Sequence, residues 1–285
     1  MFALAEFIMR GRAQAAVVAL VGSLLPLISP AAVALVTLRR GAQDGALVLA
    51  WALLPALVGL FVANMDALMT WATIAGTFVV YAAALLLRYW PSWPRMLMGL
   101  VAVSSATVLG LLFLAPEVVQ VFVSALNDML VEVQKAAKSE VSMQATTALV
   151  SGLLTCGIVL HGVAAIALGR WWQARLYNPG AFQTEFHSLR LGRVQAFVCL
   201  AATLYCSLLA DDLLAWSLVF SLPLLVAGIA LAHSLIATRK LGGQWLLLLY
   251  VTLMIFAYAS TLLIALAFID AWINFRSRVK AKPEP

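Results

Sequence analysis

Residues 145–169 read ATTALVSGLLTCGIVLHGVAAIALG and contain no Lys, Arg, Asp or Glu. A helix needs about 20 such residues to cross the ~30 Å of hydrocarbon in a bilayer. Six further runs are equally free of charge: 46–63, 67–87, 97–115, 194–210, 213–236 and 245–269. Another apolar run, 13–38, is interrupted by Pro26 and Pro30. The sequence therefore predicts a polytopic membrane protein of about eight membrane segments, the first of them proline-broken.

The composition of the chain agrees with this class. Hydrophobic residues make up 64% and charged residues 11%, whereas ordinary soluble domains carry about 25% charged residues. Backbone groups inside a bilayer must be paired within the protein, which leaves helices or closed barrels. Barrel strands alternate apolar and polar residues, and stretches such as Ala82–Leu87 do not. We therefore expect an all-α transmembrane helix bundle in which 1–285 form a single membrane domain.

The charges between the runs predict the orientation of the bundle. Loops on the cytoplasmic side of a membrane are enriched in Lys and Arg. Ten basic and two acidic residues occupy one set of connections: 39–44, 88–95, 170–193 and 239–244. Two basic and seven acidic residues occupy the alternating set: 64–66, 116–143 and 211–212. The first set is predicted to face the cytoplasm and the second set the exterior.

Both ends of the chain conflict with eight full crossings, which would place the two termini outside. Arg10 and Arg12 precede the first run, and the tail 274–285 is basic. One solution is that 13–38 is a re-entrant hairpin turning between Leu25 and Pro30, because proline removes backbone donors. The alternative is one kinked helix with an external N-terminus. At the other end, the polar patch 258–261 could mark a break in the last helix.

The segment 116–143 is predicted to be an external amphipathic helix. Phe122, Leu126 and Met129 recur at helical spacing, and polar residues occupy the other positions. Such a helix lies at the membrane interface or extends the preceding span. Two interpretations stay open: a lid over a pocket, or a plain surface helix.

The segment 170–193 is predicted to be a cytoplasmic loop that touches lipid or a partner. Aromatic side chains favour the headgroup level of a bilayer, and arginines attract anionic lipids. Either the loop anchors the protein to lipid, or it docks a cytoplasmic protein partner. The residues considered for this contact are Arg170, Trp171, Trp172, Arg175, Phe186 and Arg190.

His161 is the best candidate for a functional group inside a span. It lies nine residues before Arg170, which corresponds to ~13 Å of helix and a position near the midplane. Ser151 and Thr155 belong to a neighbouring face of small and hydroxyl residues. Ionisable groups at this depth are costly and mark functional sites, so the expected substrate contacts are His161, Thr155, Ser151, Pro26 and Pro30. The alternative is a neutral histidine bonded to a nearby carbonyl.

Three stretches resemble the YybS-like family of predicted bacterial membrane proteins, which carry a domain of unknown function. They are RWWQA at 170–174 with YNPG at 177–180, the proline break at 26–31, and DAWINFR at 270–276, where the family usually has Asp in place of Asn274. The resemblance implies a bacterial inner-membrane protein and adds Asp270 to the candidate contacts. The family is distantly similar to vitamin-uptake substrate-capture subunits and to MreD, and it implies no accepted activity.

Several chemistries have no signal in the sequence. It contains no G-x-x-x-x-G-K-[ST] phosphate loop, no H-E-x-x-H zinc helix and no G-x-S-x-G elbow. The net charge of +6 is explained by inward-facing loops and does not indicate nucleic acid. We expect no cofactor and no enzyme. The favoured function is a small-solute binding or transport module without its own energy source. The alternatives are a membrane scaffold acting through 170–193 and, third, an intramembrane enzyme.

Overall fold

The computed structural model describes residues 2–62, 67–137 and 144–280, and all regular structure in these ranges is helical. The elements are α1 (Phe2–Arg10), α2 (Arg12–Val21), η1 (Gly22–Leu24), α3 (Ile28–Arg40), α4 (Ala42–Val62), α5 (Ala67–Tyr89), α6 (Trp93–Leu114), α7 (Pro116–Ala137), α8 (Thr147–Tyr177), α9 (Ala181–Ser188), α10 (Arg193–Leu208), η2 (Asp211–Leu213), α11 (Leu214–Thr238), α12 (Gln244–Ile255), α13 (Ala257–Ile273) and α14 (Phe275–Lys280). The predicted all-α class is confirmed.

Five helices are long and apolar enough to cross a membrane: α4, α5, α6, α8 and α11. Two bent pairs raise the number of candidate spans to seven if each pair counts as one: α9 with α10, bent by 67°, and α12 with α13, bent by 118°. The chain is therefore a multi-pass membrane protein. The predicted number of eight segments is not confirmed, because the run 13–38 is divided between the shorter helices α2 and α3.

The run 13–38 turns back on itself. Helix α2 ends at Val21, and Pro26 lies between η1 and α3. Arg12, at the start of α2, forms an ion pair of 2.7 Å with Asp44 at the start of α4. Arg40, at the end of α3, donates to the carbonyl oxygen of Met9. The first residue of α2 and the last residue of α3 thus lie together, with the turn at the far end.

A second turn separates α12 from α13. Phe256 between them has an extended backbone, with φ −106° and ψ 108°, so neither helix continues through it. The end of α13 returns to the level of the α9–α10 connection, where Arg276 donates to the carbonyl of Leu189 at 2.8 Å. The sequence pointed to the polar patch 258–261 for this break, whereas the break lies at Phe256.

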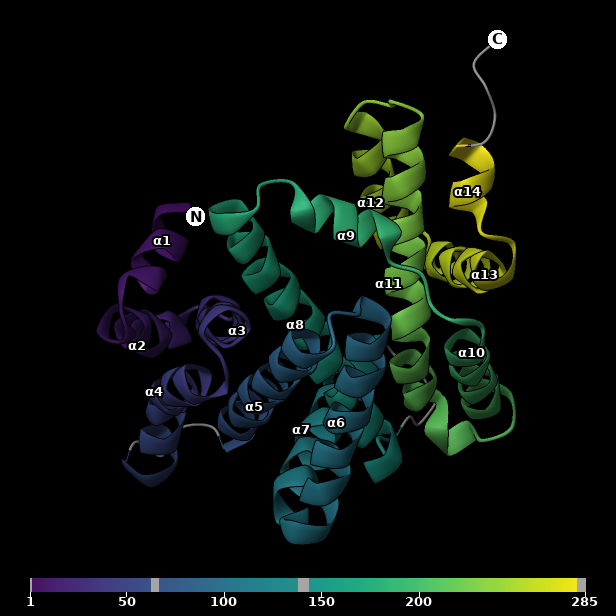
Figure 1. Cartoon of the computed structure of the whole chain (residues 1–285). Helices are drawn as coiled ribbons and strands as arrows, with labels where there is room; N and C mark the ends of the chain where they lie inside the picture. Colours follow the sequence, from purple (N-terminus) through teal and green to yellow (C-terminus); the bar gives the residue numbers. More distant parts are fainter. Residues whose placement is uncertain (1, 63–66, 138–143, 281–285) are drawn as a thin grey trace.

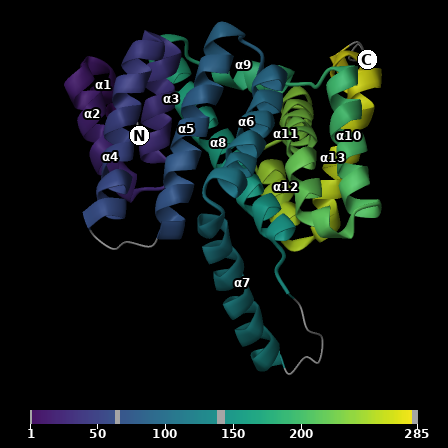
Figure 2. The same cartoon turned by 90° about the horizontal axis from the view of Figure 1, so that it is seen from below.

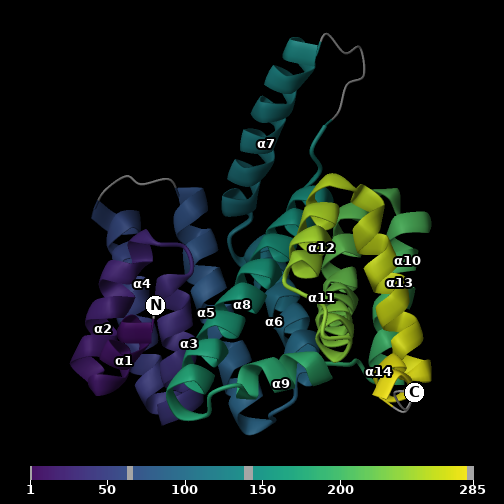
Figure 3. The ribbon, with the colours of Figure 1, turned by 90° about the horizontal axis from the view of Figure 1, so that it is seen from above.

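The arginine-bearing connections gather at one end of the molecule. Arg88 donates to the carbonyl of Leu38 at 2.7 Å, and the guanidinium of Arg39 lies 4.0 Å above the ring of Tyr177. We call this end, with Arg12, Arg39, Arg40, Arg88, Arg170, Arg190 and Arg276, the arginine face. Helices α9 and α14 lie at this end, and α7 projects from the opposite end (Figures 2 and 3).

Helix α8 occupies the middle of the bundle, with α1–α4 on one side and α10–α13 on the other (Figure 1). It packs against α3, α5, α6 and α11. Small residues allow these close approaches. A Cβ on Gly169 would lie 2.9 Å from Cβ of Ala34 on α3, and one on Gly152 would lie 2.7 Å from Cβ of Ala215 on α11.

Helix α7 is a separate amphipathic element and not a continuation of α6. The backbone breaks at Ala115, with φ −147° and ψ 62°. The apolar side of α7, including Val119, packs against the start of α8. Asn127 fixes this contact by accepting from the backbone N–H of Ala145 at 2.8 Å and donating to its carbonyl at 3.4 Å. The predicted helix at 116–143 is thus present over Pro116–Ala137, and 138–143 lie outside the described residues.

Candidate ligand pocket and the arginine face

A pocket of about 710 Å³ lies between the α2–α3 turn, α5, α7 and α8. Pockets of roughly 300–1,000 Å³ hold small molecules in proteins. Pro26 and Pro30 line it from the turn, and His161 lines it from α8. These three predicted site residues, far apart in the sequence, are therefore brought to one cavity.

Proline shapes the wall formed by the α2–α3 turn. Pro26 follows the extended residue Leu25 (φ −118°, ψ 124°), and Pro30 sits in the first turn of α3, where a missing N–H costs nothing. Between them, Ser29 is only 3% exposed, and its hydroxyl has no hydrogen-bond partner among the described residues. The turn thus brings a buried, unpaired hydroxyl to the pocket wall.

His161 is half-buried on α8, and no hydrogen bond joins it to another described residue. Gly76 of α5 lies next to it, since a Cβ there would stand 3.6 Å from Cδ2 of the imidazole. The alternative of a histidine bonded to a neighbouring carbonyl is therefore not what the geometry shows. The imidazole is instead available to a molecule in the pocket.

The other two predicted contacts, Ser151 and Thr155, do not line the pocket. The hydroxyl of Thr155 donates to the carbonyl of Ser151 at 2.7 Å, and that of Ser151 donates to Ala148 at 3.0 Å. Both are buried side chains satisfied by the backbone of their own helix. They serve helix packing at the centre of the bundle, as their position on a face of small residues allows.

Helix α7 covers one side of the pocket. Phe122, Ala125, Leu126 and Met129 from its apolar stripe are among the lining residues. Part of α7 thus borders the pocket, while the helix as a whole projects from the bundle (Figures 2 and 3). Small residues from three other helices make the space, namely Ala52, Ala72 and Gly157. Sequence reasoning missed these three, because alanine and glycine are common in membrane helices and give no chemical signal.

The interior of the pocket is uncharged. The hydroxyl of Ser23 donates to Leu20 at 2.7 Å, and that of Thr77 donates to Thr73 at 2.8 Å, so both are engaged with their own backbone. No described lining residue is Asp, Glu, Lys or Arg. The arrangement suits an apolar molecule with few polar groups, and no described lining carboxylate would balance a cation.

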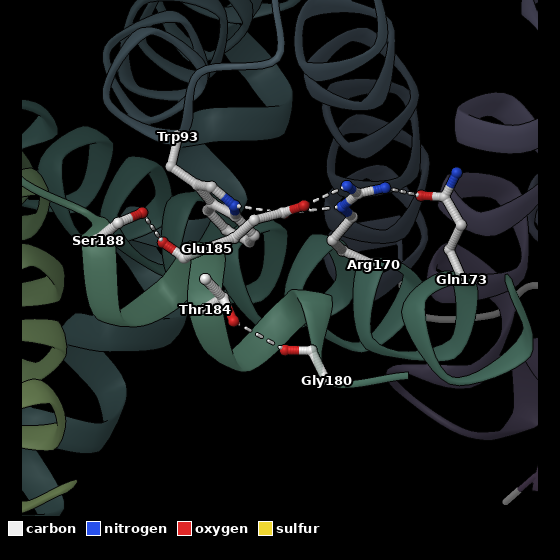
Figure 4. Close-up of polar contacts among 7 residues, drawn as sticks. All are labelled: Trp93, Arg170, Gln173, Gly180, Thr184, Glu185 and Ser188. Atoms are coloured by element: carbon white, nitrogen blue, oxygen red, sulfur yellow. Dashed lines mark hydrogen bonds and ion pairs between the residues drawn. The ribbon is translucent and has the colours of Figure 1, made fainter. Parts of the chain in front are cut away.

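The segment 170–193 is largely helical and not a loop. Helix α8 runs on to Tyr177, and α9 follows after Gly180, whose φ of 88° suits glycine. Arg170 holds α9 through an ion pair with Glu185, and its Nε–Oε2 distance is 2.9 Å. Glu185 also accepts from Nε1 of Trp93 at 3.4 Å (Figure 4). Arg170 is therefore a structural residue of the arginine face.

The aromatic residues predicted to dock a partner divide into buried and exposed ones. Trp172 is completely buried, because it continues the packed face of α8 beyond Gly169. Phe186 is half-buried and lies between Phe182 and His233, with ring centroids 6.0 and 5.4 Å away. Only Trp171 and Arg175 of the predicted contacts are exposed. The expectation that Trp172 and Phe186 form an outer docking surface is therefore not what the structure shows.

We expect Glu185→Gln to loosen α9 by about 1 kcal/mol, because the Arg170 pair is partly exposed. Burial raises the pKa of Glu185, but the hydrogen bond and charge of Arg170 and the N–H of Trp93 outweigh it, so the pKa lies below its ordinary value. The stabilisation is thus present above the unfolded-state pKa of about 4.3 and is lost as the pH falls through the folded value. Hydrogen exchange of α9 at neutral and acidic pH measures both effects. Equal exchange in wild type and variant at neutral pH would contradict the role of the pair.

Asp270 is the most buried ionisable side chain described on the arginine face, at 2% exposed. Its carboxylate forms an ion pair with Arg276 and accepts from the backbone N–H of Phe275 at 2.8 Å. Arg190 donates to the carbonyl of Asp270 at 3.4 Å. The pKa of Arg276 lies below its ordinary value. Burial lowers this pKa most, the charge of Asp270 raises it, and the charge of Arg190 lowers it. The cluster ties the end of α13 to the α9–α10 connection, so Asp270 and Arg190 belong to the internal structure.

Among the described residues, no group of three or more His, Cys, Asp or Glu side chains could hold a metal ion. No family model matches the chain, and no curated protein or solved structure matches it either. The likeness to the YybS-like family therefore stays a prediction, and function has to be argued from the pocket.

Proposed function

We propose that this multi-pass membrane protein binds a small, mainly apolar solute in the pocket between the α2–α3 turn, α5, α7 and α8. One observation carries the proposal. A cavity of about 710 Å³ is lined both by the proline-bearing turn and by His161, the two features that the sequence alone marked as costly inside a membrane. Solute binding is the first step of either capture or transport. If the protein transports the solute, a separate partner protein would supply the energy.

We further propose that the arginine face lies at the cytoplasmic leaflet of a bacterial inner membrane. Arginine-rich connections favour that side, and the exposed side chains of Trp171, Arg175 and Arg193 suit an interface with anionic lipid headgroups. In this orientation α2–α3 is a re-entrant hairpin and α7 stands outside. A cysteine placed at position 175 that reacts only from outside the cell would contradict the orientation.

Replacing Gly157 by phenylalanine is expected to abolish solute retention. Gly157 lines the pocket, and a Cβ there would meet nothing within 4 Å, so the ring would occupy the cavity without displacing backbone. Native mass spectrometry of the purified protein measures the retained molecule. We expect the bound fraction to fall at least about tenfold, since a filled pocket excludes the solute.

Gly110→Phe is the matched control. Gly110 is also helical with nothing within 4 Å of its Cβ position, but it does not line the pocket. We expect this variant to retain the solute as wild type does. Equal retention by Gly157→Phe and wild type would contradict the proposal, and so would equal loss in both variants.

A further inference from the structure

The N-terminus of α3 opens on the pocket without a capping side chain. Leu27 occupies the N-cap position and makes no side-chain hydrogen bond to the helix. The N–H of Ile28 donates to the carbonyl of Leu25 at 3.3 Å, and Pro30 has no N–H. The first turn of a helix carries a partial positive charge and N–H groups without intrahelical acceptors. Because Ala31 also donates to the carbonyl of Leu27 at 3.0 Å, the N–H of Ser29 is the described first-turn donor left for an acceptor in the pocket, and the positive helix end disfavours cations there.

Ser29 provides an independent observation at the same place. It lies in the first turn of α3, lines the pocket and is 3% exposed, and its hydroxyl has no hydrogen-bond partner among the described residues. Buried hydroxyl groups are nearly always paired. A hydroxyl can donate or accept a hydrogen bond, and a bound molecule can supply the missing partner; the positive end of α3 makes an acceptor the favoured one.

The remaining lining restricts what that molecule can be. His161 also lines the pocket with a polar side chain, whereas the hydroxyls of Ser23 and Thr77 bond to backbone carbonyls. The rest of the described lining is mostly Leu, Ala, Pro, Met and Phe. A cationic head group would meet the positive end of α3 without a carboxylate to balance it.

We propose that the pocket takes an apolar molecule with one acceptor head group, a carboxylate or carbonyl oxygen. The head accepts a hydrogen bond from Ser29 at the N-terminus of α3, and the hydrocarbon part lies along α5, α7 and α8. This inference rests on the proposed function and adds the chemical class of the solute. A free acid and the ester carbonyl of a membrane lipid share this chemistry.

Photolabelling of the full chain in nanodiscs of neutral lipid tests the class. The probes are a fatty acid with a diazirine on its chain, the amine with the same chain, and a phospholipid carrying that chain. We expect the acid to label the α2–α3 turn and the pocket side of α8, and an excess of unlabelled acid to compete. The amine is expected to label only lipid-facing helices. Competed labelling by the phospholipid would assign the site to a membrane lipid, and its absence would assign it to a free acid.

Ser29→Ala should reduce the competed labelling by about tenfold, the effect of losing one hydrogen bond to a charged group. It removes an unpaired hydroxyl, so the unfolding temperature should stay the same or rise. Ser104→Ala is the matched control, because the hydroxyl of Ser104 is also buried and unpaired but lies outside the pocket. It should leave the labelling unchanged.

The outcomes separate the two proposals. If acid and amine label the pocket equally, and Ser29→Ala changes neither, the head-group class is wrong while solute binding stands. If no probe gives competed labelling of the pocket and Gly157→Phe still retains the native solute, both proposals are wrong. Selective, competed labelling by an acceptor-headed probe that is weakened in Ser29→Ala supports both.

Discussion

Replacing Asp270 by alanine is expected to lower the free energy of unfolding by about 3–5 kcal/mol, the largest effect predicted for any single polar side chain here. The carboxylate is 2% exposed and holds both Arg276 and the backbone N–H of Phe275. Its removal leaves a buried guanidinium without a counter-ion and an unpaired N–H. Reversible unfolding in detergent micelles, followed by helical circular dichroism, measures the change.

Two further variants show whether the loss comes from the unpaired charge. Asp44→Ala removes a carboxylate whose nearest partner, Arg12, is 66% exposed and whose second partner, Arg40, lies 4.0 Å away, and it should cost less than about 1 kcal/mol. The double variant Asp270→Leu with Arg276→Met removes both charges and should recover much of the loss. A double variant as unstable as Asp270→Ala would show that the pair is not the cause.

Gly228→Ala is expected to be the most damaging single-carbon change, at about 3 kcal/mol of unfolding free energy or somewhat more. A Cβ at this point of α11 would lie 2.5 Å from the carbonyl oxygen and 2.9 Å from the carbonyl carbon of Leu263 on α13. These are backbone atoms, so only a shift of a whole helix relieves the contact. The midpoint of thermal unfolding in detergent measures the effect.

Gly110→Ala gives the opposite sign and serves as the control. Gly110 is inside α6, and nothing lies within 4 Å of its Cβ position. Alanine there should stabilise the helix by about 0.5–1 kcal/mol, because glycine is a poor helix former. Destabilisation by Gly110→Ala equal to that by Gly228→Ala would show that the close approach of α11 to α13 is not the reason.

The sequence predicted the helices well, because long charge-free runs that do not alternate apolar and polar residues can pair their backbone in a bilayer only as helices. The proline-broken first segment stays a prediction, although Pro26 lies between η1 and α3 and Pro30 in the first turn of α3. The break at Phe256 had no comparable signal. Phenylalanine adopts helical and extended backbone alike, so tertiary packing of α13 against α11 decides it.

The pocket was predictable only in part. His161 and the two prolines stood out because each is costly in a membrane helix. Gly157 contributes to the pocket only because it has no side chain. Ser29 matters because no neighbouring group forms a hydrogen bond with its hydroxyl, and a sequence does not show which groups are neighbours. Trp172 was misplaced because the span was expected to end at Arg170, whereas α8 continues to Tyr177 and turns that ring inward.

The two helix turns at the ends of the chain have a consequence for how the protein can be altered. In the proposed orientation, α2–α3 and α12–α13 each enter and leave the membrane by the same leaflet. Neither pair therefore adds a full crossing to those made by α4 through α11. Loss or exchange of either terminal unit would leave the insertion direction of α4 through α11 as it was. Helices α1 and α14 both lie at the arginine face, so in the proposed orientation a reporter fused at either end should sample the same compartment.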